Sequence, residues 1–179
     1  MEVEVTQENL SRALLHTSRL ASSRNKLPVL NNILIRTTKT QLFIAATNLE
    51  IAATQKINAK IIKQGSTTVP AKLFSDYIQN LPKEKVTLSL TQSTLTIRCG
   101  KYSSSIHCVS DEEFPELPGI TEKDATRYTV NAQDFKPDLQ QTTVAASTDA
   151  TRPVLTGIYW HAVDGKLYLA ATDGYRLAE

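Results

Sequence analysis

Basic side chains gather in one part of this sequence, and their spacing suits phosphate binding. No Asp or Glu occurs from Asn9 through Leu49, whereas six residues of that stretch are basic: Arg12, Arg19, Arg24, Lys26, Arg36 and Lys39. Arg12 and Arg19 are seven residues apart, so they share one face of a helix, and Arg24 and Lys26 follow in the connection beyond it. Such a stripe can contact phosphates by point charge, and a solvated helix face is the alternative. No aromatic residue is interleaved with these cations, which argues against stacking on single-stranded bases.

The side chains that could catalyse a reaction form no recognisable constellation. Asp173, in the segment ATDG, is conceivable as a nucleophile or general base, but no His or Lys partner lies near it in the sequence. A turn residue in an Asp-Gly pair is the favoured interpretation. No phosphate-binding loop, dinucleotide fingerprint or serine nucleophile motif occurs. The residues with metal-ligating side chains are scattered and predict neither a metal site nor a cofactor: His16, His107, His161, Cys99 and Cys108.

The segment TDGYRLAE at residues 172–179 has the composition of a protein-binding surface. Tyr175, Arg176 and Leu177 combine an aromatic ring, a guanidinium group and an aliphatic side chain. Tyrosine and arginine are enriched in the residues that dominate protein–protein affinity. A plain strand end is the competing interpretation.

The composition is that of an ordinary globular chain. Of the 179 residues, 41% are hydrophobic and 21% are charged, which is enough for a core and close to the average of folded domains. The net charge of +2 means that any site for a polyanion is local. No apolar run approaches the roughly 18 residues of a membrane span, and the acidic start MEVEVTQENL is no signal peptide. Two cysteines make no disulfide framework, so a reducing cytoplasm is expected.

Hydrophobic periodicity predicts a few helices among many short strands. The apolar residues of 8–22 and 71–81 have helical spacing, and Thr6 is expected to cap the first of these helices. Residues 127–147 are predicted to form a further strand and helix, in which Pro137 is tolerable only in the first turn. Residues 110–126 are polar, contain prolines and read as a linker, with the acidic run 111–113 as a solvated loop. Strands are predicted at 1–6, 33–36, 42–46, 50–56, 59–62, 86–90, 94–99 and 103–109.

An internal repeat organises these elements. Residues 28–47 and 153–172 align without a gap at an offset of 125, and eight of the twenty positions are identical. The register extends back to the N-terminus, so the repeating unit is about 125 residues long. The first copy is complete and the second stops after about 54 residues, which suggests the N-terminal part of a longer protein. The pattern strand–helix–strands, repeated, predicts an α+β fold with antiparallel sheets.

The sequence resembles the bacterial DNA polymerase III beta subunit family, the sliding clamps. The resemblance lies in SSRNKLPVLNNILI (22–35), TTVPAKLFSDYIQNLP (67–82), DEEFPELP (111–118) and above all ATDGYRLA (171–178). It implies a clamp fold in which each domain doubles a βαβββ unit, with helices inside and sheets outside. It also implies a homodimeric ring that encloses double-stranded DNA, catalyses nothing and tethers other proteins. Those partners would be the polymerase III alpha subunit, the clamp loader delta subunit and other proteins with clamp-binding motifs.

The same resemblance assigns DNA contacts to individual residues. Arg24 matches a DNA-contacting loop arginine, and Lys72 matches a basic contact at the start of the second helix. Asp149, Pro153 and Val154 fall in a second DNA-facing loop. Asp149 departs from the family pattern because a carboxylate repels phosphate, whereas Val154 can offer a backbone amide.

Two protein contacts are also implied by the resemblance. The head-to-tail dimer contact uses the strand at 103–109, where Ser104 replaces a usually apolar residue and leaves Ile106 as the better anchor. Tyr175 stands where the family often has His, and its ring can gate a pocket for partner peptides. One wall of that pocket is assigned to Leu155, Thr172, Gly174, Tyr175, Arg176 and Leu177.

The expected organisation is therefore a complete clamp domain at 1–119, a linker at 120–126 and the first half of a second domain at 127–179. The third domain is absent from this sequence, and so is the other pocket wall. The expected location is the bacterial cytoplasm, in association with the nucleoid. Two rival functions remain open: an enzyme that uses Asp173, and a protein-interaction module of the same fold with no role on DNA.

Overall fold

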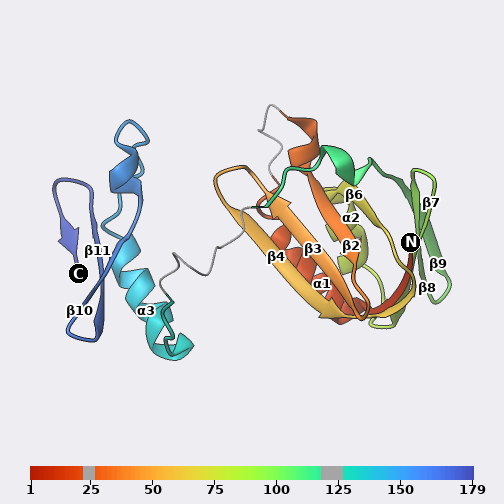
Figure 1. Ribbon diagram of the computed structural model, residues 1–179, viewed down its shortest axis with the longest axis horizontal. Coiled ribbons are helices and arrows are strands. Elements are labelled where there is room, and N and C mark those ends of the chain that lie inside the picture. The colour runs from red at the N-terminus through yellow and green to blue at the C-terminus, as the bar shows by residue number, and fades with distance from the viewer. Residues whose placement is uncertain (22–26, 118–126) are drawn as a thin grey trace. The chain divides into compact units, whose positions relative to one another are not determined.

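The computed structural model describes residues 1–21, 27–117 and 127–179, so the predicted DNA contacts Arg24 and Lys26 and the linker at 120–126 lie outside the described residues. The chain forms two compact units, a first unit that ends at Gly119 and a second that starts at Ile120. Each unit is described by itself (Figure 1). No helix of the described part is both long and apolar enough to cross a membrane.

Two antiparallel sheets and two helices make up the first unit. One sheet has the order β4-β3-β2-β6 and the other the order β5-β1-β7-β8-β9. The helices are α1 (Gln7–Thr17) and α2 (Ala71–Gln79). The strands are β1 (Glu2–Thr6), β2 (Asn32–Thr37), β3 (Gln41–Thr47), β4 (Ala52–Asn58), β5 (Lys60–Lys63), β6 (Ser66–Pro70), β7 (Lys85–Thr91), β8 (Thr94–Cys99) and β9 (Tyr102–His107).

The strand order shows a doubled βαβββ unit whose halves exchange their first strands. β1 pairs with β7, which belongs to the second half, while β6 pairs with β2, which belongs to the first. Each sheet therefore needs strands from both halves, so neither half is closed without the other. The predicted α+β clamp fold, with antiparallel sheets and few helices, is confirmed in this unit.

The two helices cover one face of the sheets and share a single core with them. In Figure 1 they lie behind β2, β3 and β4, and α1 contacts α2, β3 and β4. Their buried faces carry Leu10, Leu14, Phe74 and Ile78, each with no exposed surface. Burying a side chain of this size stabilises the fold by about 1.5–3 kcal/mol, so these positions fix both helices on the sheets.

The ends of α1 differ from the sequence prediction. Thr6 occupies the N-cap position, but its side chain makes no capping hydrogen bond. The first helical residue is held instead by the residue before β7, because the Gln7 amide donates to the Glu84 carbonyl at 2.9 Å. The helix ends at Thr17 rather than near residue 22. Its hydroxyl donates to the Ala13 carbonyl at 3.0 Å, and the Leu20 amide turns back to the Thr17 carbonyl at 3.1 Å, which closes the last turn tightly.

The segment 111–117 is not the solvated linker that its composition predicted. A short 3-10 turn at Asp111–Glu113 leads into Phe114, which is only 8% exposed and packs with Leu34 and Ala45 on a second, smaller core. Asp111 also accepts a hydrogen bond from Arg36 at 3.2 Å. The face of the β4-β3-β2-β6 sheet that bears Leu34 and Ala45 is therefore covered by a segment without periodicity, which a pattern search cannot detect.

The second unit repeats the helix and the first strands of the first unit. It contains α3 (Ala132–Thr143), β10 (Tyr159–Val163), β11 (Lys166–Thr172) and β12 (Leu177–Ala178), with the sheet order β10-β11-β12. Pro137 is the sixth residue of α3, not part of its first turn as expected, so the Gln133 carbonyl has no amide donor from that position.

The strand expected at the start of this unit is absent, because residues 127–131 pair with no other strand of the described residues. Its counterpart β1 is held on both sides by β5 and β7, and the described residues of the second unit hold no counterpart of either strand.

Candidate functional site

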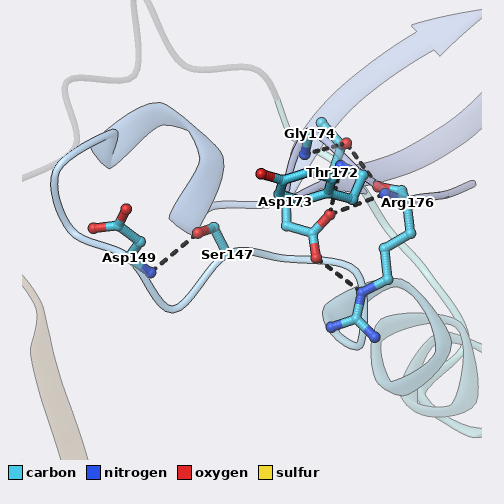
Figure 2. A network of polar contacts seen from close by, with 7 residues as sticks. Ser147, Asp149, Thr172, Asp173, Gly174 and Arg176 are labelled. Atoms are coloured by element: carbon cyan, nitrogen blue, oxygen red, sulfur yellow. Dashed lines mark hydrogen bonds and ion pairs between the residues drawn. The ribbon is translucent and has the colours of Figure 1, made fainter.

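A tight turn between β11 and β12 carries the predicted peptide-binding residues (Figure 2). The Thr172 hydroxyl closes it by donating to the Arg176 carbonyl at 2.7 Å and accepting from the Gly174 amide at 3.0 Å. Asp173 Oδ1 accepts from the Tyr175 and Arg176 amides, each at 2.9 Å. Gly174 has φ of +92°, a conformation that residues with a Cβ rarely adopt. The turn is therefore defined by side-chain contacts to its own backbone.

The carboxylate of Asp173 is fully engaged in this structural role. Its second oxygen, Oδ2, accepts from Arg176 Nε at 3.0 Å. The backbone hydrogen bonds from Arg176 and Tyr175 lower the pKa of Asp173, and the Arg176 side chain lowers it further. A carboxylate with a depressed pKa is a weak base, so the turn-residue interpretation is favoured over an enzyme that uses Asp173.

The same turn occurs at the equivalent position of the first unit. The Thr47 hydroxyl donates to the Ile51 carbonyl at 2.9 Å and accepts from the Leu49 amide at 3.0 Å, as Thr172 does in the second unit. Asn48 Oδ1 accepts from the Glu50 and Ile51 amides. Leu49 has φ of +76° where Gly174 has +92°. The sequences diverge after the shared threonine but the backbone does not, a similarity that alignment alone missed.

The side chains of the candidate pocket differ in their exposure to solvent. Tyr175 is 95% exposed and Leu177 69% exposed, so the turn presents an aromatic ring and an aliphatic side chain to solvent. Leu155 is half-buried and is fixed by its backbone, whose carbonyl accepts from the Ser147 amide at 2.9 Å. An exposed ring next to an exposed leucine is typical of a surface that a partner covers.

Arg152 also belongs to this neighbourhood, and sequence reasoning missed it. Its Nη1 lies 3.8 Å from the position that a Cβ on Gly174 would occupy. This is an ordinary van der Waals distance, so the Arg152 side chain lies next to the turn. The signal in the sequence was an arginine directly before the repeat's Pro153.

Asp149 is held within its own loop, as Figure 2 shows for its contact with Ser147. Its backbone amide donates to Ser147 Oγ at 3.0 Å, and its carboxylate accepts from the Thr151 amide and hydroxyl at 2.9 and 2.8 Å. Those contacts to Thr151 lower the pKa of Asp149, so it stays ionised at neutral pH. Pro153 and Val154 follow in the 3-10 turn Pro153–Thr156, and Val154 is 86% exposed.

The helix pair of the first unit carries unpaired cations. Arg12 and Arg19 of the α1 region and Lys72 of α2 are exposed, and none of them has an ion pair within the described residues. Glu8, the acid of α1, is paired with Lys83 at 3.1 Å. Asp76 follows Lys72 by one turn, yet the two form no ion pair. The exposed cations of both helices therefore remain free to attract an anion.

The edge strand β9 carries the two residues predicted to contact a second subunit, Ser104 and Ile106. Ile106 is 5% exposed and lies in the main core of the first unit, so little of its side chain is open to a partner, and its role in a dimer contact stays a prediction. It faces inward because it lies opposite the buried Leu95 on β8. Ser104 is half-buried on the same side of the strand. β9 lies at the edge of its sheet, so its outer backbone edge is open to pair with another chain.

The cysteines and histidines show no metal centre. No group of three or more potential ligands occurs among the described residues. Cys99 and Cys108 are both buried, and desolvation raises the pKa of each thiol. Thiols with a raised pKa are weak nucleophiles, so both cysteines serve packing.

Comparison with known proteins gives one consistent result. Residues 1–118 match the family described as DNA polymerase III beta subunit, N-terminal domain, and residues 129–179 match its central domain. The beta sliding clamp of Streptomyces coelicolor is 31% identical over 178 residues, which are 99% of this chain and 46% of that protein. The beta sliding clamp of Synechococcus elongatus is 32% identical over 181 residues, which cover 99% of this chain and 48% of that protein. This chain thus spans about half the length of these relatives.

Solved structures agree with the sequence comparison. The DnaN sliding clamp of Bartonella birtlesii, solved with griselimycin bound, is 35% identical, with a TM-score of 0.89 over 99% of this chain and 48% of that one. The pol III beta of Caulobacter crescentus is 29% identical, with a TM-score of 0.86 over 99% of this chain and 49% of that one. The exchange of strands between the two halves of the first unit agrees with the matches to both domain families. This chain therefore belongs to the DNA polymerase III beta subunit family.

Proposed function

We propose that this chain is part of a sliding clamp, a ring that encloses duplex DNA without reading its sequence and catalyses no reaction. The observation that carries the proposal is a set of exposed cations without an ion pair within the described residues: Arg12 on α1, Arg19 in the turn after α1 and Lys72 on α2. Unpaired cations on rigid helices attract phosphates regardless of base sequence, and such binding weakens as salt rises. Arg24, Lys26, Pro153 and Val154 are proposed to add contacts from loops.

Asp149 is proposed to take no direct part in phosphate binding. Its carboxylate is committed to Thr151 and stays charged, so it repels phosphate. Its role is to shape the loop that presents Pro153 and Val154.

A peptide pocket is the second part of the proposal. Leu155, Thr172, Gly174, Tyr175, Arg176 and Leu177 form one wall of it, and sequence beyond residue 179 supplies the other. Its ligands are short clamp-binding motifs of the polymerase III alpha subunit, the clamp loader delta subunit and other proteins of replication and repair. Because the related Bartonella clamp binds griselimycin, this compound is expected to bind this protein as well.

The proposed assembly is a homodimeric ring in the bacterial cytoplasm, on nucleoid DNA. Residues 1–119 form the first clamp domain, 120–126 a linker and 127–179 the first half of a second domain. The free edge of β9 makes the dimer contact through its backbone, with Ser104 near the interface and Ile106 supporting the strand from within.

Charge neutralisation tests the DNA-binding part. Arg12→Gln and Lys72→Gln are each expected to flatten the slope of log affinity against log salt by about one unit per lost phosphate contact. Lys85→Gln is the matched control: it removes the same charge from the five-stranded sheet, where Lys85 pairs with Glu4 at 3.2 Å. Equal DNA retention by all three variants and the unmodified protein would favour the alternative, an interaction module with no role on DNA.

A further inference from the structure

Comparison of the two equivalent turns shows that the two carboxylate oxygens of Asp173 have different roles. In the first unit the Asn48 side chain supports its turn with a single oxygen, Oδ1, at 3.1 and 2.9 Å from the Glu50 and Ile51 amides. In the second unit Asp173 Oδ1 makes the same two contacts. An amide oxygen is therefore sufficient for the turn, and the turn alone does not explain a carboxylate at position 173.

The second oxygen of Asp173 has a task that exists only in the second unit. Oδ2 accepts from Arg176 Nε at 3.0 Å, and Figure 2 shows the guanidinium lying against the carboxylate. The counterpart of Arg176 in the first unit is Ile51, which has no group to hold. The carboxylate is thus matched to the arginine three residues later.

The way in which Arg176 is held leaves its binding groups available. The contact uses Nε, and neither Nη group has a hydrogen-bond partner within the described residues. The Arg176 side chain is 60% exposed. A free surface arginine samples many rotamers, and a ligand that uses it must order it first. Here the contact with Asp173 restricts the Arg176 side chain before a ligand arrives.

We propose that Asp173 is a positioning residue of the peptide pocket: it fixes Arg176 so that both Nη groups can donate to acceptor oxygens of a bound peptide, either main-chain carbonyls or a carboxylate. This inference rests on the proposed function of the pocket. Asp173 itself does not touch the peptide. It acts through Arg176, while Tyr175 and Leu177 supply the apolar contact.

The test uses the full-length protein and a fluorescent peptide that carries the clamp-binding motif of the polymerase III alpha subunit from the same organism. Asp173→Asn keeps the oxygen that supports the turn and weakens the hold on Arg176. It should reduce peptide affinity about fivefold, the upper range for an exposed ion pair, without changing the melting temperature. Asn48→Asp is the matched control: it introduces a carboxylate into the equivalent turn without an arginine, and the affinity should not change.

A double variant distinguishes positioning from a general structural effect. If Asp173 acts through Arg176, Asp173→Asn should have no further effect in an Arg176→Met background. Additive losses in the double variant, or an Asp173→Asn protein that binds as tightly as the unmodified one, would overturn the inference. If the unmodified protein fails to bind the peptide, the proposed pocket itself is wrong. A pair of peptides with Glu or Gln at the contacting position shows whether the acceptor is a carboxylate or the main chain.

Discussion

At the scale of single residues, the two turns have the same backbone conformation but carry different exposed side chains. Thr47 and Thr172 make the same hydrogen bonds, and the exposed side chains around them set what each turn can bind. Composition singled out Tyr175, Arg176 and Leu177 in the second turn as a binding surface, and this stays a prediction. The sequence also favoured a turn role for Asp173, which the hydrogen bonds from the Tyr175 and Arg176 amides confirm. It did not predict the contact of the same carboxylate with the Arg176 side chain.

The exposed pair Tyr175 and Leu177 is expected to dominate peptide affinity. Replacing both by Ala should weaken a clamp-binding peptide by at least about 2 kcal/mol, the usual scale of a binding hot spot. Fluorescence anisotropy with the full-length protein measures this. Ile51→Ala, at the 56% exposed counterpart of Arg176 in the first unit, is the control and should leave affinity unchanged. Unchanged binding by the double-alanine protein would contradict the pocket assignment.

Asp111 is expected to make the first unit sensitive to acid. A hydrogen bond from Ser66, followed by the Arg36 contact, lowers the pKa of Asp111 in the folded protein. A group with a depressed folded pKa contributes stability above its unfolded pKa of about 3.9, and this contribution is lost as pH falls through the folded pKa. Asp111→Asn should therefore reduce the loss of stability below about pH 4. The contribution is small, under about 1 kcal/mol, because Arg36 is largely exposed.

Unfolding curves recorded from pH 7 down to pH 2 measure this effect. Asp76→Asn, on the exposed face of α2, is the matched control. An identical acid response in Asp111→Asn and the unmodified protein would show that Ser66 and Arg36 do not stabilise the Asp111 carboxylate in solution.

At the scale of elements, periodic segments were predicted well and aperiodic ones poorly. Leu10, Leu14, Phe74 and Ile78 recur at helical spacing, and the structure buries all four between α1, α2 and the sheets. The segment around Phe114 has no hydrophobic periodicity. A single buried aromatic side chain holds it against the sheet, and one residue makes no repeating pattern. Residues 127–131 form no strand despite their alternation, because pairing depends on neighbours that a local pattern does not specify.

Phe114 is expected to be a main contact of the segment that covers the outer sheet face. Phe114→Ala should cost about 3 kcal/mol, as in other deletions of a buried ring, because a cavity opens against Leu34 and Ala45. Glu116→Ala, at an exposed position two residues later, should cost less than about 0.5 kcal/mol. Thermal unfolding gives the difference, and amide hydrogen exchange in β2 and β3 locates it. Equal stability of the two variants would mean that the segment is a linker after all.

At the scale of the whole molecule, topology explains why the first unit is a closed structure. The exchange of β1 and β6 between its halves gives each sheet strands from both, so one core holds them together. The internal repeat predicted this doubling only in outline, because the exchange depends on which strands pair. A small net charge likewise concealed a helix face whose cations have no acidic partners within the described residues.

The central claim is that the ring holds DNA by enclosing it rather than by gripping it, and linearisation of a circular substrate tests this most directly. The full-length protein is loaded by its own clamp loader onto a nicked plasmid, the plasmid is cut once, and gel filtration follows the DNA-bound fraction. The proposal predicts that the protein stays on the circle and is lost from the linear DNA by sliding off its ends. Equal retention on linear and circular DNA would contradict topological tethering.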